Sequence, residues 1–117
     1  MSAVQLLQVA RDILTPANRW AQKPVPRGCE CALSAIFKAM SLLHDPEEKS
    51  GERNLAMKAA CECLIEAIGE PSITRWNDVP GRTQAEVLEA LDRAIALGEA
   101  REARAAEQDA AGSGATA

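Results

Sequence analysis

The chain has 117 residues, of which 47% are hydrophobic and 26% charged, and its net charge is −4. This length favours one domain with its own core. The negative charge argues against a nucleic-acid partner, because phosphate binding needs a concentrated positive face. No stretch has the length and apolarity of a membrane span, and polar residues interrupt the first apolar run, so a secretory signal is not expected. We therefore expect a cytoplasmic protein whose four cysteines are thiols.

Three helices with apolar stripes are predicted in the first two-thirds of the chain. Residues 3–14 follow Ser2, a favourable N-cap, and stop before a proline. Residues 29–43 place large apolar side chains three or four positions apart, which is the helical period. Residues 53–68 carry a similar stripe that alanines widen, and Gly69 follows as a typical helix stop. No alternating strand pattern occurs in the sequence.

A fourth main helix is predicted after a turn. Ser72 can cap a short helical turn that runs through Asn77. Thr83 and Glu86 have the spacing of a capping box, in which the hydroxyl and the carboxylate each bind a free backbone N–H. We expect the helix that starts here to weaken or end at Gly98.

These elements predict an all-α fold, a small bundle of four main helices plus short turns. Residues 1–98 are expected to form a single helical domain. Residues 99–117 contain much alanine, glutamate and arginine and no large apolar side chain. We expect them to form a polar, Ala-rich helical extension, followed by a disordered tail from residue 112.

Two Cys-Glu-Cys sequences, at 29–31 and 61–63, form the first candidate site. Residues i and i+2 of a helix point about 200° apart, so these pairs cannot chelate one zinc ion on an intact helix. A nucleophilic thiol needs a base, and His44, the one histidine, lies about 20 Å along the same helix from its first cysteine. We therefore expect no metal ligand, no cofactor and no assembled catalytic group, with the thiols packed between helices. The alternative is a catalytic role for Cys31 with Asp78.

The sequence WNDVPGRT at 76–83 is the second candidate site. Its Asn and Asp favour turns through bonds from side chain to backbone, and Pro-Gly reverses the chain, so a structural role explains the whole segment. The alternative is an exposed surface that binds a ligand or partner. The residues predicted for that surface are Trp76, Asn77, Asp78 and Arg82.

The segments CALSAI at 31–36 and ITRWNDVPGRTQAEVLEAL at 73–91 resemble a family of small bacterial and phage proteins known only as a domain of unknown function. The family pattern is Cys-Ala-x-Gly-Ala, then Trp-Asn-Asp-x-x-Gly-Arg-Thr-x-x-Glu-Val. Ser34 stands where the pattern has glycine. The resemblance implies a helical fold and a bacterial or phage origin, and it brings no activity. The matching positions are Cys31, Ala32, Ala35, Trp76, Asn77, Asp78, Gly81, Arg82, Thr83, Glu86 and Val87.

Small size, acidic character and the lack of a catalytic constellation favour a non-enzymatic accessory protein that binds another protein. Acidic helical proteins can cover basic surfaces by charge complementarity, and a phage protein directed at host or defence machinery is one such setting. The alternative is a small thiol-dependent enzyme or ligand-binding domain that uses Cys31 near the Asn77–Asp78 turn. The partner is unidentified, no membrane partner is expected, and a homodimer stays open as an alternative.

Overall fold

The computed structural model describes residues 1–115 of the chain, and the side chains of residues 1–110. No strand occurs in the described residues, which confirms the all-α fold class. Residues 116 and 117, at the end of the predicted disordered tail, lie outside the described part. The helices in chain order are α1 (Ala3–Leu14), α2 (Ala32–Leu42), α3 (Ser50–Ile68), α4 (Ile73–Asn77) and α5 (Gln84–Ala115).

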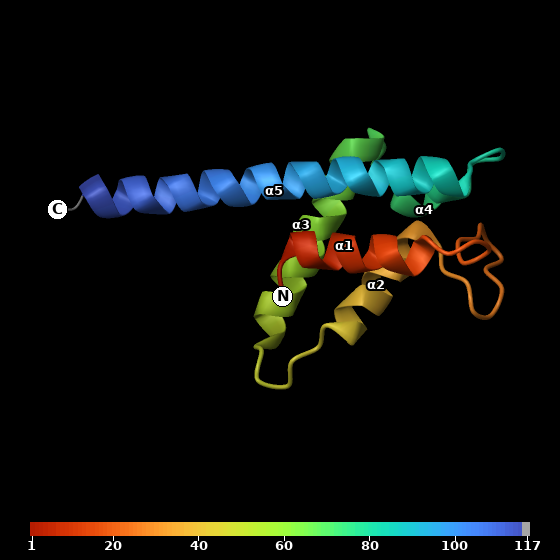
Figure 1. The fold of residues 1–117 in the computed structure, drawn as a ribbon, viewed down its shortest axis with the longest axis horizontal. Coiled ribbons are helices and arrows are strands. Elements are labelled where there is room, and N and C mark those ends of the chain that lie inside the picture. Colours follow the sequence, from red (N-terminus) through yellow and green to blue (C-terminus); the bar gives the residue numbers. More distant parts are fainter. Residues whose placement is uncertain (116–117) are drawn as a thin grey trace.

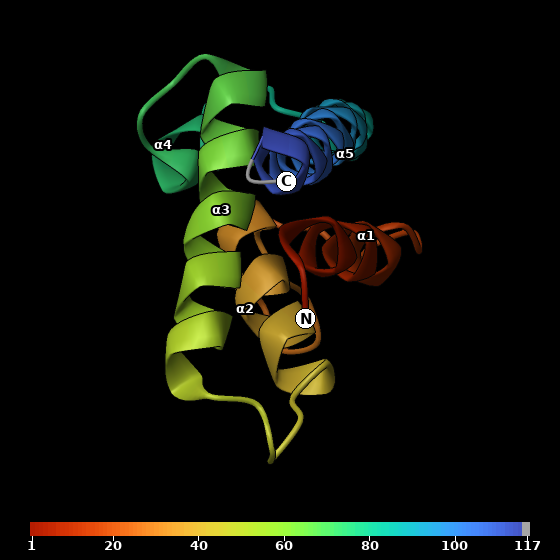
Figure 2. The ribbon, with the colours of Figure 1, turned by 90° about the vertical axis from the view of Figure 1, so that its left-hand side faces the viewer.

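The long helix α5 and the first helix α1 lie side by side and run in opposite directions (Figure 1). Helix α3 crosses both of them, and α2 packs on α1 and on the first half of α3 (Figure 2). The short helix α4 contacts α2 and α3 near the start of α5. No helix in the described residues is long and apolar enough to cross a membrane.

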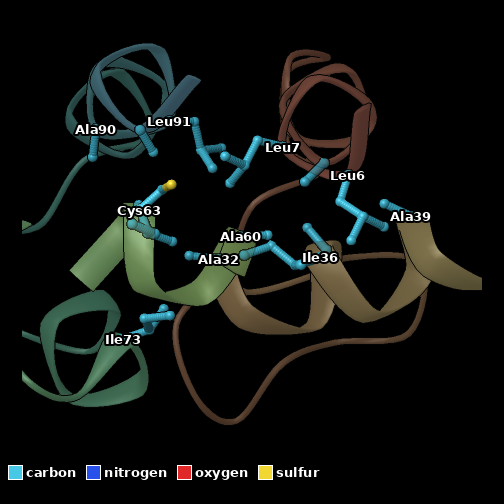
Figure 3. Close-up of a cluster of buried hydrophobic side chains, with 14 of the residues drawn as sticks. Leu6, Leu7, Ala32, Ile36, Ala39, Ala60, Cys63, Ile73, Ala90 and Leu91 are labelled. Carbon is cyan, nitrogen blue, oxygen red and sulfur yellow. The ribbon is translucent and has the colours of Figure 1, made fainter. Parts of the chain in front are cut away.

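The core lies where these helices meet (Figure 3). Leu7 of α1, Ile36 of α2, Leu64 of α3 and Leu91 of α5 are fully buried. Burial of each such side chain stabilises the fold by about 1.5–3 kcal/mol. Alanines fill the remaining contacts and let the helix axes approach closely. The fully buried alanines are Ala10, Ala32, Ala35, Ala39, Ala60, Ala90 and Ala94.

Helix α2 begins later than the predicted 29–43 segment, because Cys31 is its N-cap. Cys31 has an extended backbone, with φ −84° and ψ 174°, and its Sγ accepts a hydrogen bond from the N–H of Ser34 at 3.3 Å. Glu30 lies in the preceding loop, where its N–H donates to the carbonyl of Arg19 at 2.8 Å. The prediction that Cys29 starts this helix is therefore wrong. Helix α3, in contrast, begins at Ser50, before the predicted start.

Gly98 does not end α5, which was one of the two outcomes expected at this position. The helix continues through it to Ala115, and Gly98 is buried against α1 and α3. A Cβ at this position would lie 3.0 Å from Cγ2 of Val4 and 3.7 Å from Sγ of Cys63. The glycine therefore serves close helix packing. Beyond it, residues 102–110 are exposed, and this part of α5 projects away from the other helices (Figure 1).

Candidate functional site

The side chain of Asn77, at the end of α4, is fully buried and forms four hydrogen bonds. Its Oδ1 accepts from the indole N–H of Trp20 at 2.7 Å and from the N–H of Ala32 at 2.9 Å. Its Nδ2 donates to the carbonyl of Ala21 at 3.2 Å and to Oδ1 of Asp78 at 3.0 Å. These bonds use the full capacity of the amide. Asn77 therefore joins α4 to the start of α2 and to the proline-rich loop, residues 15–31, that connects α1 to α2.

Asp78 also holds this loop, through a hydrogen bond to the loop backbone. Its Oδ1 also accepts from the backbone N–H of Lys23 at 3.0 Å. This bond, with the bond from Asn77, holds the pKa of Asp78 below its ordinary value, because both stabilise the carboxylate. Nearby, Nε2 of Gln22 donates to the carbonyls of Asn77 and Val79, at 3.1 and 2.7 Å. The loop is thus held both by side chains of the turn and by the side chain of its own Gln22.

Arg82 closes the turn onto the start of α5. Its guanidinium carbon lies 4.2 Å from the ring centroid of Trp76, and its Nε donates to the Trp76 carbonyl at 3.0 Å. Its Nη1 donates to Oε2 of Glu86 at 2.8 Å. This bond has the largest part in lowering the pKa of Glu86, and the bond from the Thr83 hydroxyl adds to it. Thr83 and Glu86 also exchange the two bonds of the predicted capping box, each at 3.2 Å.

The turn is consequently a structural joint. Asn77 is 0% exposed and Trp76 is 7% exposed. Both side chains are therefore buried, and neither forms part of an exposed surface for a ligand or partner. Asp78 and Arg82 are partly exposed, but their polar atoms bind the loop, the turn backbone and α5. The structural interpretation of 76–83 accounts for every one of these contacts.

The thiol of Cys31 caps α2 beside this joint. The N–H of the next residue, Ala32, donates to Oδ1 of Asn77. Nδ2 of the same Asn77 side chain donates to Asp78. Within the described residues no hydrogen bond joins the sulfur of Cys31 to the carboxylate of Asp78, and each has a different partner. The alternative catalytic pair thus has no direct contact to carry it. His44 lies beyond the far end of α2, with Nδ1 2.8 Å from Nη1 of Arg53.

The other three thiols lie in separate environments. Cys29 donates from Sγ to the carbonyl of Asn18 at 3.1 Å. Cys63 is buried and accepts from Nη1 of Arg101 at 3.4 Å, and Cys61 is half-buried on α3. Burial raises the pKa of both Cys61 and Cys63, because it disfavours the thiolate. In the described part of the chain, no three His, Cys, Asp or Glu side chains come together as ligands of one metal ion.

A different site, which the sequence interpretation missed, lies between the start of α1 and the connection from α2 to α3. A recess of about 500 Å³ opens there, and we call it the acidic recess. Residues 45–52, which complete the connection and begin α3, hold four carboxylates and one lysine. Its turn is fixed by Asp45, whose Oδ1 accepts from the N–H of Glu47 at 2.9 Å. The lining includes Gln5, Leu43, Asp45, Glu47, Glu48 and Glu52.

Glu48 is the buried member of the acidic recess. Its side chain is 9% exposed, and its Oε1 accepts from the α-ammonium of Met1 at 2.7 Å. Its Oε2 is buried and has no hydrogen-bond partner within the described residues. Within the residues that the structure describes, Asp45, Glu47 and Glu52 form no ion pair. Four carboxylates in eight residues were the sequence signal for this site.

The order of helices, the buried Asn77 and the capped turn invite comparison with known families. The model of the family of unknown function DUF6197 matches residues 1–97. The chain belongs to the DUF6197 family. The matched residues include both the joint around Asn77 and the acidic recess, whereas residues 98–115 of α5 lie beyond the match. No curated protein and no solved structure matched the chain in these comparisons.

Proposed function

We propose that the protein is a non-enzymatic accessory protein that binds a basic surface of another protein through the acidic recess. The observation that carries this proposal is the state of three carboxylates at the recess. Asp45, Glu47 and Glu52 are exposed and form no ion pair within the described residues. Neighbouring like charges repel, and a basic partner relieves that repulsion.

Some carboxylates elsewhere in the fold bind groups inside the molecule, although others, such as Asp12, Glu62 and Glu70, form no ion pair within the described residues either. Asp78 and Glu86 bind the groups of the 76–83 joint. Asp92 of α5 pairs with Arg11 of α1. Glu66 of α3 pairs with Arg101 of α5. Those charges serve contacts inside the molecule, whereas those around the recess remain available to a partner.

Basic surfaces are typical of proteins that handle nucleic acids, which makes them the partner class with matching charge. A phage protein that covers such a surface on host or defence machinery remains the setting that we expect. Charge complementarity raises association rates most strongly at low salt. Binding through the recess should therefore weaken as the ionic strength rises.

A capture experiment with matched variants tests the proposal. The full chain is immobilised and exposed to a bacterial lysate, beside Glu47→Gln/Glu52→Gln and the control Glu107→Gln/Asp109→Asn. Both double variants remove two negative charges, but the control residues lie on the exposed extension of α5. We expect wild type and control to retain a common partner that the recess variant loses. Equal capture by all three proteins would contradict the proposal.

A further inference from the structure

We propose that the acidic recess receives an arginine side chain of the partner, with Oε2 of Glu48 as its buried acceptor; this inference rests on the proposed function. The side chain of Glu48 is 9% exposed, and it lines the recess. Its Oε2 is buried without a hydrogen-bond partner in the described residues. A buried acceptor without a donor is costly, and more so when it is charged, so a cationic donor is the ligand chemistry that this atom favours.

The carboxylate of Glu48 already accepts one positively charged donor. The α-ammonium of Met1 lies 2.7 Å from Oε1, and the Met1 side chain is 1% exposed. That contact leaves the second oxygen of the carboxylate for another N–H group. Two donors on one carboxylate are within its acceptor capacity.

The acceptors of the recess fit a guanidinium better than an ammonium. Four carboxylates, all from residues 45–52, are among the residues that line the recess. A guanidinium presents five N–H donors in a rigid plane and can bind several acceptors together, whereas an ammonium is a compact point charge. Leu43, which also lines the recess, offers an apolar surface for the methylene stem of arginine. Gln5 adds an amide at the α1 side.

Fluorescence anisotropy with two labelled peptides tests the proposal on the full chain. Each acetylated peptide has four basic residues separated by glycines, arginine in one and lysine in the other. We expect wild type to bind the arginine peptide at least about fivefold more tightly, because one guanidinium can donate to Oε2 of Glu48 and to a second carboxylate of the recess together. Glu48→Gln should weaken that binding by about tenfold, since it removes a charge-assisted bond. The control Glu107→Gln should stay within about twofold of wild type.

Several outcomes would overturn the inference. Equal affinities for the two peptides, or equal losses in Glu48→Gln and Glu107→Gln, would show general charge attraction. Displacement of the arginine peptide by micromolar calcium chloride would identify a metal site instead. Should Glu48→Gln fail to fold, Glu52→Gln at the same recess must weaken arginine-peptide binding, and unchanged binding would reject the inference. A partner that is lost with Glu47→Gln/Glu52→Gln, without arginine-peptide binding, would reject this inference alone and retain the proposed function.

Discussion

Oδ1 of Asn77 accepts a hydrogen bond at 2.7 Å from the indole nitrogen of Trp20, which lies 57 positions earlier in the chain. The same oxygen accepts from the N–H of Ala32 at the start of α2. One buried amide therefore joins three segments that the sequence separates widely. This relationship explains why Asn77 faces inward, although it lies in a polar turn.

Substitution of Asn77 by alanine should lower the free energy of unfolding by about 3 kcal/mol, because several buried groups lose their partners together. The groups affected include the N–H of Ala32 and the carbonyl of Ala21. Urea denaturation measures the change. Thr74→Ala, at an exposed position of the same short helix, should change the free energy by less than about 0.5 kcal/mol. Equal effects of the two substitutions would contradict the structural role of Asn77.

Gly98→Ala should destabilise the fold by about 1–2 kcal/mol, although alanine is the better helix former. The added Cβ would lie 3.0 Å from Cγ2 of Val4. Gly51→Ala is the matched control, because nothing lies within 4 Å of its added Cβ, and it should raise stability by about 0.5 kcal/mol. Thermal and urea unfolding report both changes. Adding Val4→Ala should partly rescue Gly98→Ala, and the absence of any rescue would count against the close contact.

Asp78→Asn should remove a pH-dependent part of the stability. Hydrogen bonds from Lys23 and Asn77 depress the pKa of Asp78 in the folded state, so its stabilising effect is present above the unfolded value of about 3.9 and is lost as the pH falls through the folded value. At pH 7 the variant should be about 1 kcal/mol less stable than wild type. Urea unfolding should show this difference shrinking below pH 4. A constant difference across that range, or the same behaviour in Asp109→Asn, would contradict it.

The thiols of Cys61 and Cys63 should react slowly with iodoacetamide in the folded protein at neutral pH. Burial raises the pKa of both, which reduces the reactive thiolate. Cys63 should react more slowly than Cys61, because it is 1% exposed. Mass spectrometry of peptides labelled in the native and urea-unfolded chain measures the protection. Native labelling of Cys63 as fast as in the unfolded chain would show that the helices around it open readily.

Much of the fold follows from local sequence signals. Ser2 and Thr83 cap α1 and α5 as predicted, because hydroxyl caps act within a single turn. The start of α2 was misplaced, since the apolar period extends back to Cys29, whereas the helix begins after Cys31, whose thiol is an uncommon N-cap. The packing role of Gly98 was not predicted, for a different reason. Its packing partner Val4 lies at the other end of the chain, where no local pattern can indicate it.

The candidate site was predicted less well than the fold. For WNDVPGRT the sequence favoured a structural role and left recognition as the alternative, because whether Asn77 is exposed depends on where the distant loop around Trp20 packs. The acidic recess depends on contact between the start of α1 and the connection after α2, as the bond from Met1 to Glu48 shows. Charge in a connection is visible in a sequence, whereas a buried carboxylate oxygen without a partner is visible only in the structure.

The most direct test of this account compares the joint with the acidic recess in one capture measurement. Immobilised wild type, Asp78→Asn and Glu47→Gln/Glu52→Gln are exposed to the same lysate at low salt, after circular dichroism has shown that each is folded. We predict that Asp78→Asn retains the partner of the wild type, because Asp78 binds the loop, and that the double variant loses it. Loss of the partner by Asp78→Asn together with its retention by Glu47→Gln/Glu52→Gln would contradict the account.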